Sequence, residues 1–294
     1  MHDFACSQIR CRSILRLSEN TAIMIPKSAT HLDIDGLQLE YRRYGSSGDD
    51  RPTLVLLHEG LGCVERWKTF PELLAEATGC QALAYSRRGY GSSIGRLPPW
   101  PLTYMHEEAL EVLPRVLDVA AIDRAILIGH SDGASIALIQ AGGGNDPRLQ
   151  AMVLMAPHVF VEQVAVDSIR QARAAFEGDD LRERLERYHG DNVDDAFRGW
   201  NGAWLDPGFR QWNIEPYLAS ISIPLLLIQG EDDQYGSHRQ LESIAGRVRG
   251  PVTTCLLPDC RHSPHLDQPE ATLREIARFV TALISADHRS SSPV

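Results

Sequence analysis

The chain has 294 residues, of which 43% are hydrophobic and 23% are charged, and its net charge is −10. A chain of about 300 residues buries roughly 75% of its unfolded surface, so this composition suits a globular core and excludes a disordered chain. The net charge is negative, and no stretch of the sequence is strongly basic. We therefore expect neither nucleic acid nor an anionic membrane surface as a partner.

An N-terminal extension, residues 1–28, precedes the expected fold. Charged residues recur there too closely for the apolar stretch of a signal peptide, at Asp3, Arg10, Arg12, Arg16 and Glu19. The sequence also has no run of 18 apolar residues, the length that a membrane-spanning helix needs. We therefore expect a cytoplasmic protein, with Met1 or Met24 as its start. In a chain of this length, six cysteines indicate reduced thiols rather than a disulfide framework.

Residues 31–35 and 37–41 alternate in polarity around Gly36, which predicts a β-hairpin. Short unbroken apolar runs, typical of strands buried on both faces, then recur at 54–57, 82–85, 125–128, 152–155, 225–228 and 253–257. Segments with helical periodicity lie between them, at 66–79, 103–121, 133–143, 237–248 and 269–285. This alternation predicts an α/β fold, with a mostly parallel, doubly wound sheet of about eight strands.

One interval departs from this alternation. Residues 159–219 contain no strand-like run, and they are far too long for an ordinary connection. Their pattern predicts helices at 160–176, 180–188, 192–200 and 206–220. We interpret this interval as a helical cap inserted into a core made of 29–158 and 220–286, and residues 287–294 as a polar tail.

The predicted strand 125–128 runs directly into Gly129-His130-Ser131-Asp132-Gly133, and a helical segment follows. This is the G-x-S-x-G pattern in the strand–turn–helix context that gives it meaning, because the sharp turn exposes the serine hydroxyl. The backbone N–H of Asp132, at the start of the helix, is placed to stabilise an oxyanion. The pattern predicts Ser131 as a nucleophile.

A serine nucleophile needs a base and an acid that orients the base. Three carboxylates, Glu231, Asp232 and Asp233, follow the strand 225–228, and two histidines, His262 and His265, follow the strand 253–257. Because parallel strands end at one edge of their sheet, serine, acid and base are expected to converge there. The same histidine segment is a weak candidate for a metal site, but no second segment supplies paired ligands, so we expect no metal.

These features together resemble the α/β-hydrolase family over about residues 31–285. Leu57-His58-Glu59-Gly60 resembles its segment after the third strand, and Arg88-Gly89-Tyr90-Gly91-Ser92 resembles its turn after the fourth. The resemblance implies Asp233 as the acid, His262 as the base and the N–H of Gly60 as the second oxyanion donor. Many members of the family carry a helical cap. We expect no cofactor.

Two positions depart from the family pattern. Arg261 stands where the family usually has glycine, which leaves the geometry of the histidine loop open. Glu59 also replaces a glycine, and three interpretations remain for it: a salt-bridge partner, a substrate contact, or a side chain turned outward.

The expected reaction is hydrolysis of a small carboxylic ester or lactone through an acyl-enzyme. The cap is rich in aromatic residues, and Trp200, Trp204 and Trp212 either line a pocket for this small-molecule substrate or seal the cap onto the core. One alternative is a hydrolase that cleaves a carbon–carbon bond in aromatic ring-cleavage products, with a substrate carboxylate held by Arg88, Arg198 or Arg210. Another is a non-catalytic small-molecule receptor with the same fold. His58, His130 and His158 are expected to be structural.

Overall fold

The computed structural model describes residues 30–46 and 51–290. The predicted N-terminal extension 1–28 therefore lies outside the described residues, as do residues 291–294 of the predicted tail. Within the described ranges, no helix combines the length and the apolar composition needed to cross a bilayer.

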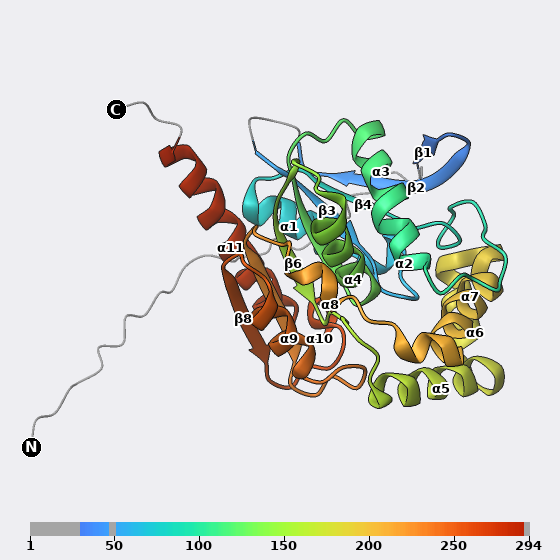
Figure 1. The fold of residues 1–294 in the computed structure, drawn as a ribbon. Coiled ribbons are helices and arrows are strands. Elements are labelled where there is room, and N and C mark those ends of the chain that lie inside the picture. Colours follow the sequence, from blue (N-terminus) through green and yellow to red (C-terminus); the bar gives the residue numbers. More distant parts are fainter. Residues whose placement is uncertain (1–29, 47–50, 291–294) are drawn as a thin grey trace, which may run out of the picture.

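A single eight-stranded sheet forms the centre of the molecule (Figure 1), in the order β1-β2-β4-β3-β5-β6-β7-β8. β2 runs antiparallel to both of its neighbours, β1 and β4. The remaining pairs, in the order β4-β3-β5-β6-β7-β8, are all parallel. The strands are β1 (Thr30–Ile34), β2 (Leu37–Tyr44), β3 (Thr53–Leu57), β4 (Ala82–Tyr85), β5 (Ala125–His130), β6 (Leu149–Met155), β7 (Leu225–Gly230) and β8 (Val252–Leu257). The predicted mostly parallel sheet, with its N-terminal hairpin, is confirmed.

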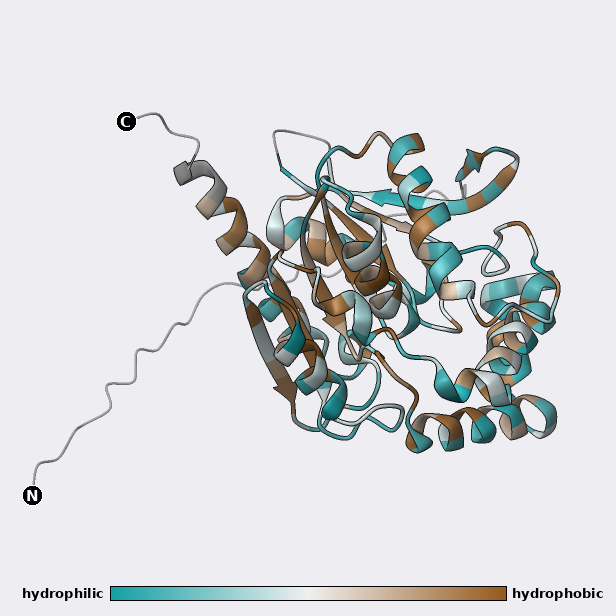
Figure 2. Ribbon diagram, in the orientation of Figure 1, coloured by the Kyte–Doolittle hydropathy of each residue, from teal (hydrophilic) through white to brown (hydrophobic). Residues whose placement is uncertain are grey.

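Alternate residues of the central strands face two separate hydrophobic clusters. On β3, for example, Val55 and Leu57 belong to one cluster, while Leu54 and Leu56 belong to the other. The strands accordingly stand out as apolar in Figure 2. This double burial is the physical reason why the strands read as unbroken apolar runs in the sequence.

Helices cover both faces of the sheet. The second cluster includes residues of α1 (Phe70–Thr78) and α11 (Pro269–Ser290), which also contact each other. The first cluster includes residues of α2 (Tyr104–Glu107), α3 (Leu113–Val119), α4 (Asp132–Ile139) and α9 (Arg239–Arg247), together with residues of the helices between β6 and β7. A single turn of 3-10 helix, Val64–Trp67, precedes α1, and π-helical turns at Glu108–Val112 and Gln140–Gly144 lengthen α2 and α4.

The chain between β6 and β7 is helical, as predicted, and projects to one side of the sheet (Figure 1). We call residues 159–219 the cap segment. It contains α5 (Gln163–Gly178), α6 (Leu181–His189), α7 (Val193–Leu205) and α8 (Glu215–Leu218), with short 3-10 turns at Gly190–Asn192 and Pro207–Gln211.

Three helix predictions need correction. The single helix predicted at 206–220 is wrong: Asp206 caps a 3-10 turn through the N–H of Gly208, and extended residues separate that turn from α8. A four-residue helix, α10 (Pro264–Asp267), was not predicted. Finally, α11 continues to Ser290 and so takes in part of the predicted tail.

Candidate active site

Ser131 lies in the sharp turn that joins β5 to α4. Its backbone has φ 53° and ψ −117°, a strained conformation that costs a non-glycine residue about 1–3 kcal/mol. The two flanking glycines permit the turn, because a Cβ on Gly133 would lie 2.0 Å from the carbonyl oxygen of Leu57, and a Cβ on Gly129 would lie 2.5 Å from the Cα of Ala134. Close packing therefore holds the strained turn in place.

Ser131, His262 and Asp233 form a continuous hydrogen-bonded chain across three loops. His262 Nδ1 lies 2.8 Å from Asp233 Oδ1, and His262 Nε2 lies 2.9 Å from Ser131 Oγ. An ionised carboxylate only accepts hydrogen bonds, so Nδ1 carries the proton and Nε2 accepts from the serine hydroxyl. The structure thus brings together the three residues predicted as nucleophile, base and acid.

The surroundings of Asp233 keep its carboxylate charged. Burial alone would raise the pKa of this carboxyl, but His262 and the N–H of Tyr235, which donates to Oδ1 at 2.8 Å, outweigh burial and hold the pKa well below its usual value. The other two carboxylates that follow β7, Glu231 and Asp232, are exposed.

His265, the alternative base, packs in α10 behind the site. Its ring centroid lies 4.8 Å from that of Trp67 and 5.5 Å from that of Phe70. Burial lowers the pKa of His265 to about 3, so its ring is neutral at ordinary pH. Arg261 leaves the histidine loop intact, because its backbone N–H donates to Asp267 Oδ2 at 3.0 Å and its side chain is exposed.

The two predicted oxyanion donors belong to loops that meet beside Ser131. Asp132 begins α4, and backbone N–H groups in the first turn of a helix have no intrahelical acceptor. Gly60 follows β3, and Gly133 packs directly against the carbonyl groups of Leu57 and His58 in that loop. The start of α4 and the loop 58–60, which we call the oxyanion loop, are therefore adjacent.

Glu59 connects the oxyanion loop to the loop of the predicted base. Its carboxylate forms an ion pair with Arg66 Nε at 3.1 Å and lies 3.4 Å from His130 Nδ1, and its side chain is 16% exposed. His130 Nε2 donates to the carbonyl oxygen of His262 at 2.7 Å. Burial alone would raise the pKa of Glu59, but His130 and Arg66 hold it well below its usual value. Of the three interpretations of Glu59, the structure supports a salt-bridge partner.

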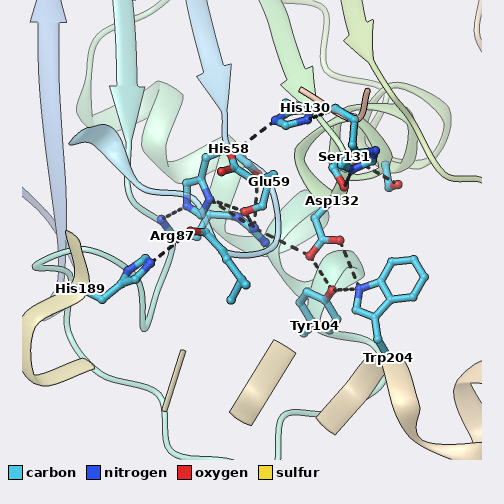
Figure 3. A network of polar contacts seen from close by, with 12 residues as sticks. His58, Glu59, Arg87, Tyr104, His130, Ser131, Asp132, His189 and Trp204 are labelled. Carbon is cyan, nitrogen blue, oxygen red and sulfur yellow. Dashed lines mark hydrogen bonds and ion pairs between the residues drawn. The ribbon is translucent and has the colours of Figure 1, made fainter. Parts of the chain in front are cut away.

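The Asp132 side chain is the centre of a buried polar network (Figure 3). The Tyr104 hydroxyl donates to Oδ2 at 2.6 Å, and Trp204 Nε1, which also lies 3.0 Å from that hydroxyl, donates to Oδ1 at 3.3 Å. Arg87 Nη2 lies 3.9 Å from Oδ2. Burial raises the pKa of Asp132 above its usual value despite these partners. The cap segment is thereby hydrogen-bonded to the residue that follows Ser131.

The three tryptophans predicted to bind substrate differ in position. Trp200 covers the oxyanion loop so closely that a Cβ on Gly60 would lie 2.0 Å from its Nε1. Trp204 reaches the start of α4 through the contacts above. Trp212 packs against Trp204 at a centroid distance of 6.1 Å and stacks on Phe209, and its buried Nε1 has no hydrogen-bond partner within the described part of the chain.

The arginines suggested as carboxylate ligands lie elsewhere than expected. The side chains of Arg88, Arg198 and Arg210 are all exposed. The arginine buried beside the nucleophile turn is Arg87, which is 2% exposed and which sequence reasoning missed. Its signal in the sequence was a charge two residues after the buried strand β4, at the edge of the sheet where the other site residues gather.

Comparison with known proteins agrees with this architecture. A model of the alpha/beta hydrolase family matches residues 54–275. The chain belongs to this family. Solved α/β-hydrolase-like neighbours include the enol-lactonase from Burkholderia xenovorans, with a TM-score of 0.66 and 19% identity over 85% of this chain and 99% of that one. Proline iminopeptidase from Mycobacterium smegmatis has a TM-score of 0.69 and 17% identity over 88% and 100%. At these identities the likeness concerns the fold alone.

Among curated proteins, this α/β-hydrolase is 29% identical over 160 residues to N-formylmaleamate deformylase from Pseudomonas putida, a match that covers 51% of this chain and 56% of that protein. It is 28% identical over 153 residues to epoxide hydrolase 2 from Siraitia grosvenorii, covering 51% and 45%. The chain thus spans about half the length of the curated relatives it matches. The matching family model describes alpha/beta hydrolases, and these two relatives are named as a deformylase and an epoxide hydrolase.

Proposed function

We propose that this hydrolase cleaves a small carboxylic ester or lactone through an acyl-enzyme formed on Ser131. The observation that carries the proposal is the unbroken chain of hydrogen bonds from Ser131 through His262 to Asp233. In this geometry His262 Nε2 accepts the hydroxyl proton as Ser131 Oγ attacks the carbonyl carbon. Asp233 fixes the tautomer of His262 and stabilises the imidazolium that forms.

The carbonyl oxygen becomes negatively charged in the tetrahedral intermediate. The backbone N–H groups of Gly60 and Asp132 are the proposed donors to this oxyanion, and each such donor is worth about 100- to 1000-fold in rate. The imidazolium then protonates the departing alcohol oxygen. Water, deprotonated by His262, releases the acid and regenerates Ser131.

The choice of bond follows from the nucleophile. Attack by Ser131 on an epoxide carbon would leave an ether, which has no carbonyl group for water to attack, so the enzyme would stay blocked. Attack on an ester or lactone leaves a serine ester that water can cleave. The relative named as a deformylase fits carbonyl chemistry, whereas the match to an epoxide hydrolase fits the shared fold.

The alternatives have less support. A carbon–carbon hydrolase of ring-cleavage products was expected to use Arg88, Arg198 or Arg210, and these side chains are exposed. A non-catalytic receptor does not need the hydrogen bonds that link Ser131 to His262 and His262 to Asp233.

The test measures hydrolysis of p-nitrophenyl esters of increasing chain length and of simple lactones by the wild type and by Ser131→Ala. The matched control is Ser92→Ala, an exposed serine, and circular dichroism verifies the fold of each variant. We expect Ser131→Ala to lose at least about 1000-fold in kcat, and Ser92→Ala to retain wild-type rates. A fluorophosphonate probe should label the wild type once, at Ser131. Equal rates for the wild type and Ser131→Ala would refute the proposal.

A further inference from the structure

The peptide bond between Glu59 and Gly60 carries the proposed oxyanion donor, and its carbonyl oxygen is unusually well bound. In a planar trans peptide the C=O and N–H groups point in opposite directions, so whatever holds the oxygen also aims the N–H. The Glu59 oxygen accepts hydrogen bonds from His58 Nδ1 at 2.7 Å, from Arg87 Nη2 at 2.9 Å and from the Gly62 N–H at 3.1 Å.

Arg87 determines how His58 takes part. The backbone N–H of Arg87 donates to His58 Nε2 at 3.0 Å, so Nε2 is unprotonated and Nδ1 carries the proton. Burial, with Arg87 beside it, lowers the pKa of His58 well below its usual value, so the ring stays neutral and keeps this tautomer. His58 Nδ1 can therefore only donate, and it donates to the Glu59 oxygen.

The Arg87 guanidinium also binds the oxyanion loop. Nη2 also lies 3.3 Å from the His58 carbonyl oxygen, so a single cation binds two successive carbonyl groups. The side chain is 3% exposed, and its charge is opposed by the buried carboxylates of Asp132, at 3.9 Å, and Glu108. Hydrogen bonds from a buried cation are roughly twice as strong as neutral ones, and they polarise the acceptor peptide, which makes its N–H a better donor.

We propose that Arg87 is a positioning residue that, together with His58, holds the Glu59 carbonyl and so aims the Gly60 N–H at the oxyanion. This inference rests on the proposed acyl transfer at Ser131. It assigns Arg87 a role in the transition state rather than in binding the substrate, because its guanidinium binds the backbone carbonyl groups of the oxyanion loop.

The experiment compares Arg87→Met, Arg87→Lys and Arg115→Met, the last being an exposed arginine of α3 that serves as the control. Two substrates are used: p-nitrophenyl acetate, which is neutral, and mono-p-nitrophenyl glutarate, which carries a carboxylate. We expect Arg87→Met to lose about 10- to 100-fold in kcat on both esters with little change in KM, because a misaimed donor loses part of the value of an oxyanion contact. Arg87→Lys should recover part of this loss, and Arg115→Met should match the wild type.

A second readout separates aiming from a general structural defect. A trifluoromethyl ketone forms a tetrahedral oxyanion adduct with a serine, whereas the matching methyl ketone binds mainly as a ground-state ligand. Arg87→Met should weaken inhibition by the trifluoromethyl ketone by the same factor as kcat and leave the methyl ketone unchanged. If Arg87→Met does not fold, Arg87→Met combined with Glu108→Gln removes one of the opposing buried carboxylates and permits the same measurements.

Three results would overturn the inference: a kcat within threefold of the wild type, a loss confined to the KM of the glutarate ester, or equal weakening of both ketones. The second result would make Arg87 a ligand of substrate carboxylates instead. Failure of the proposed function looks different, because the wild type itself would then be inactive towards esters and Ser131 would remain unlabelled by the fluorophosphonate.

Discussion

Trp204 offers a quantitative test of how the cap segment is attached to the core. Replacing Trp204 with Phe keeps an aromatic ring but removes the Nε1–H that donates to the Tyr104 hydroxyl at 3.0 Å and to Asp132 Oδ1 at 3.3 Å. A hydrogen bond to a charged group contributes about 1.5–3 kcal/mol, and here the acceptor is a carboxylate that is 1% exposed. The substitution also leaves a small cavity, which lowers the free energy of unfolding independently of the hydrogen bond.

Trp212→Phe is the control, because it leaves a similar cavity and its effect can be subtracted. Trp212 is also buried and packs in the same aromatic group, but its Nε1 has no hydrogen-bond partner within the described residues. We therefore expect Trp204→Phe to lower the free energy of unfolding by about 1.5–3 kcal/mol more than Trp212→Phe does. Urea denaturation followed by far-UV circular dichroism measures both variants. Equal destabilisation by the two substitutions would refute the assignment of a stabilising hydrogen bond to Asp132.

Two further predictions concern the predicted acid and the Glu59 ion pair. Asp233→Asn should lower kcat by about 10,000-fold, because the amide no longer fixes the reactive tautomer of His262, and ester hydrolysis within tenfold of the wild type would contradict that role. Glu59→Gln should lower the free energy of unfolding by about 1–3 kcal/mol at neutral pH, since the contacts with Arg66 and His130 lose the acceptor charge. The folded pKa of Glu59 lies below its unfolded value of about 4.3, so this contribution is present above that value and is lost as the pH falls through the folded pKa. Urea denaturation at a series of pH values should therefore show the two proteins converging below about pH 4, and a constant difference would count against the ion pair.

The sheet could be predicted from the sequence because its physical signal is local. Each central strand is buried on both faces, so its residues are apolar without interruption. All six predicted runs correspond to strands, although the last of them, β8, lies at the edge of the sheet and is largely exposed. The convergence of Ser131, Asp233 and His262 was predictable for a related reason: once the strands are parallel, the residues that follow them share one edge of the sheet.

Contacts set by the approach of distant segments were beyond sequence reasoning. Nothing in the periodicity of 206–220 shows that Asp206 starts a separate 3-10 turn, although Pro207 marks a natural start for one. Arg87 gave only the bare signal of a charge after a strand. Its guanidinium reaches the Glu59 carbonyl because two loops pack together. The two residues are 28 positions apart in the chain, so no local pattern shows this contact.

The backbone conformation of Ser131 also limits which residue types can replace it. With φ at 53°, a β-branched residue is strongly strained, so threonine is disfavoured here even though it carries the same hydroxyl. Cysteine is unbranched and close in size, and Gly129 and Gly133 would leave the turn unchanged around it. The turn therefore permits an exchange of oxygen for sulfur, whereas it disfavours the exchange of one alcohol for another.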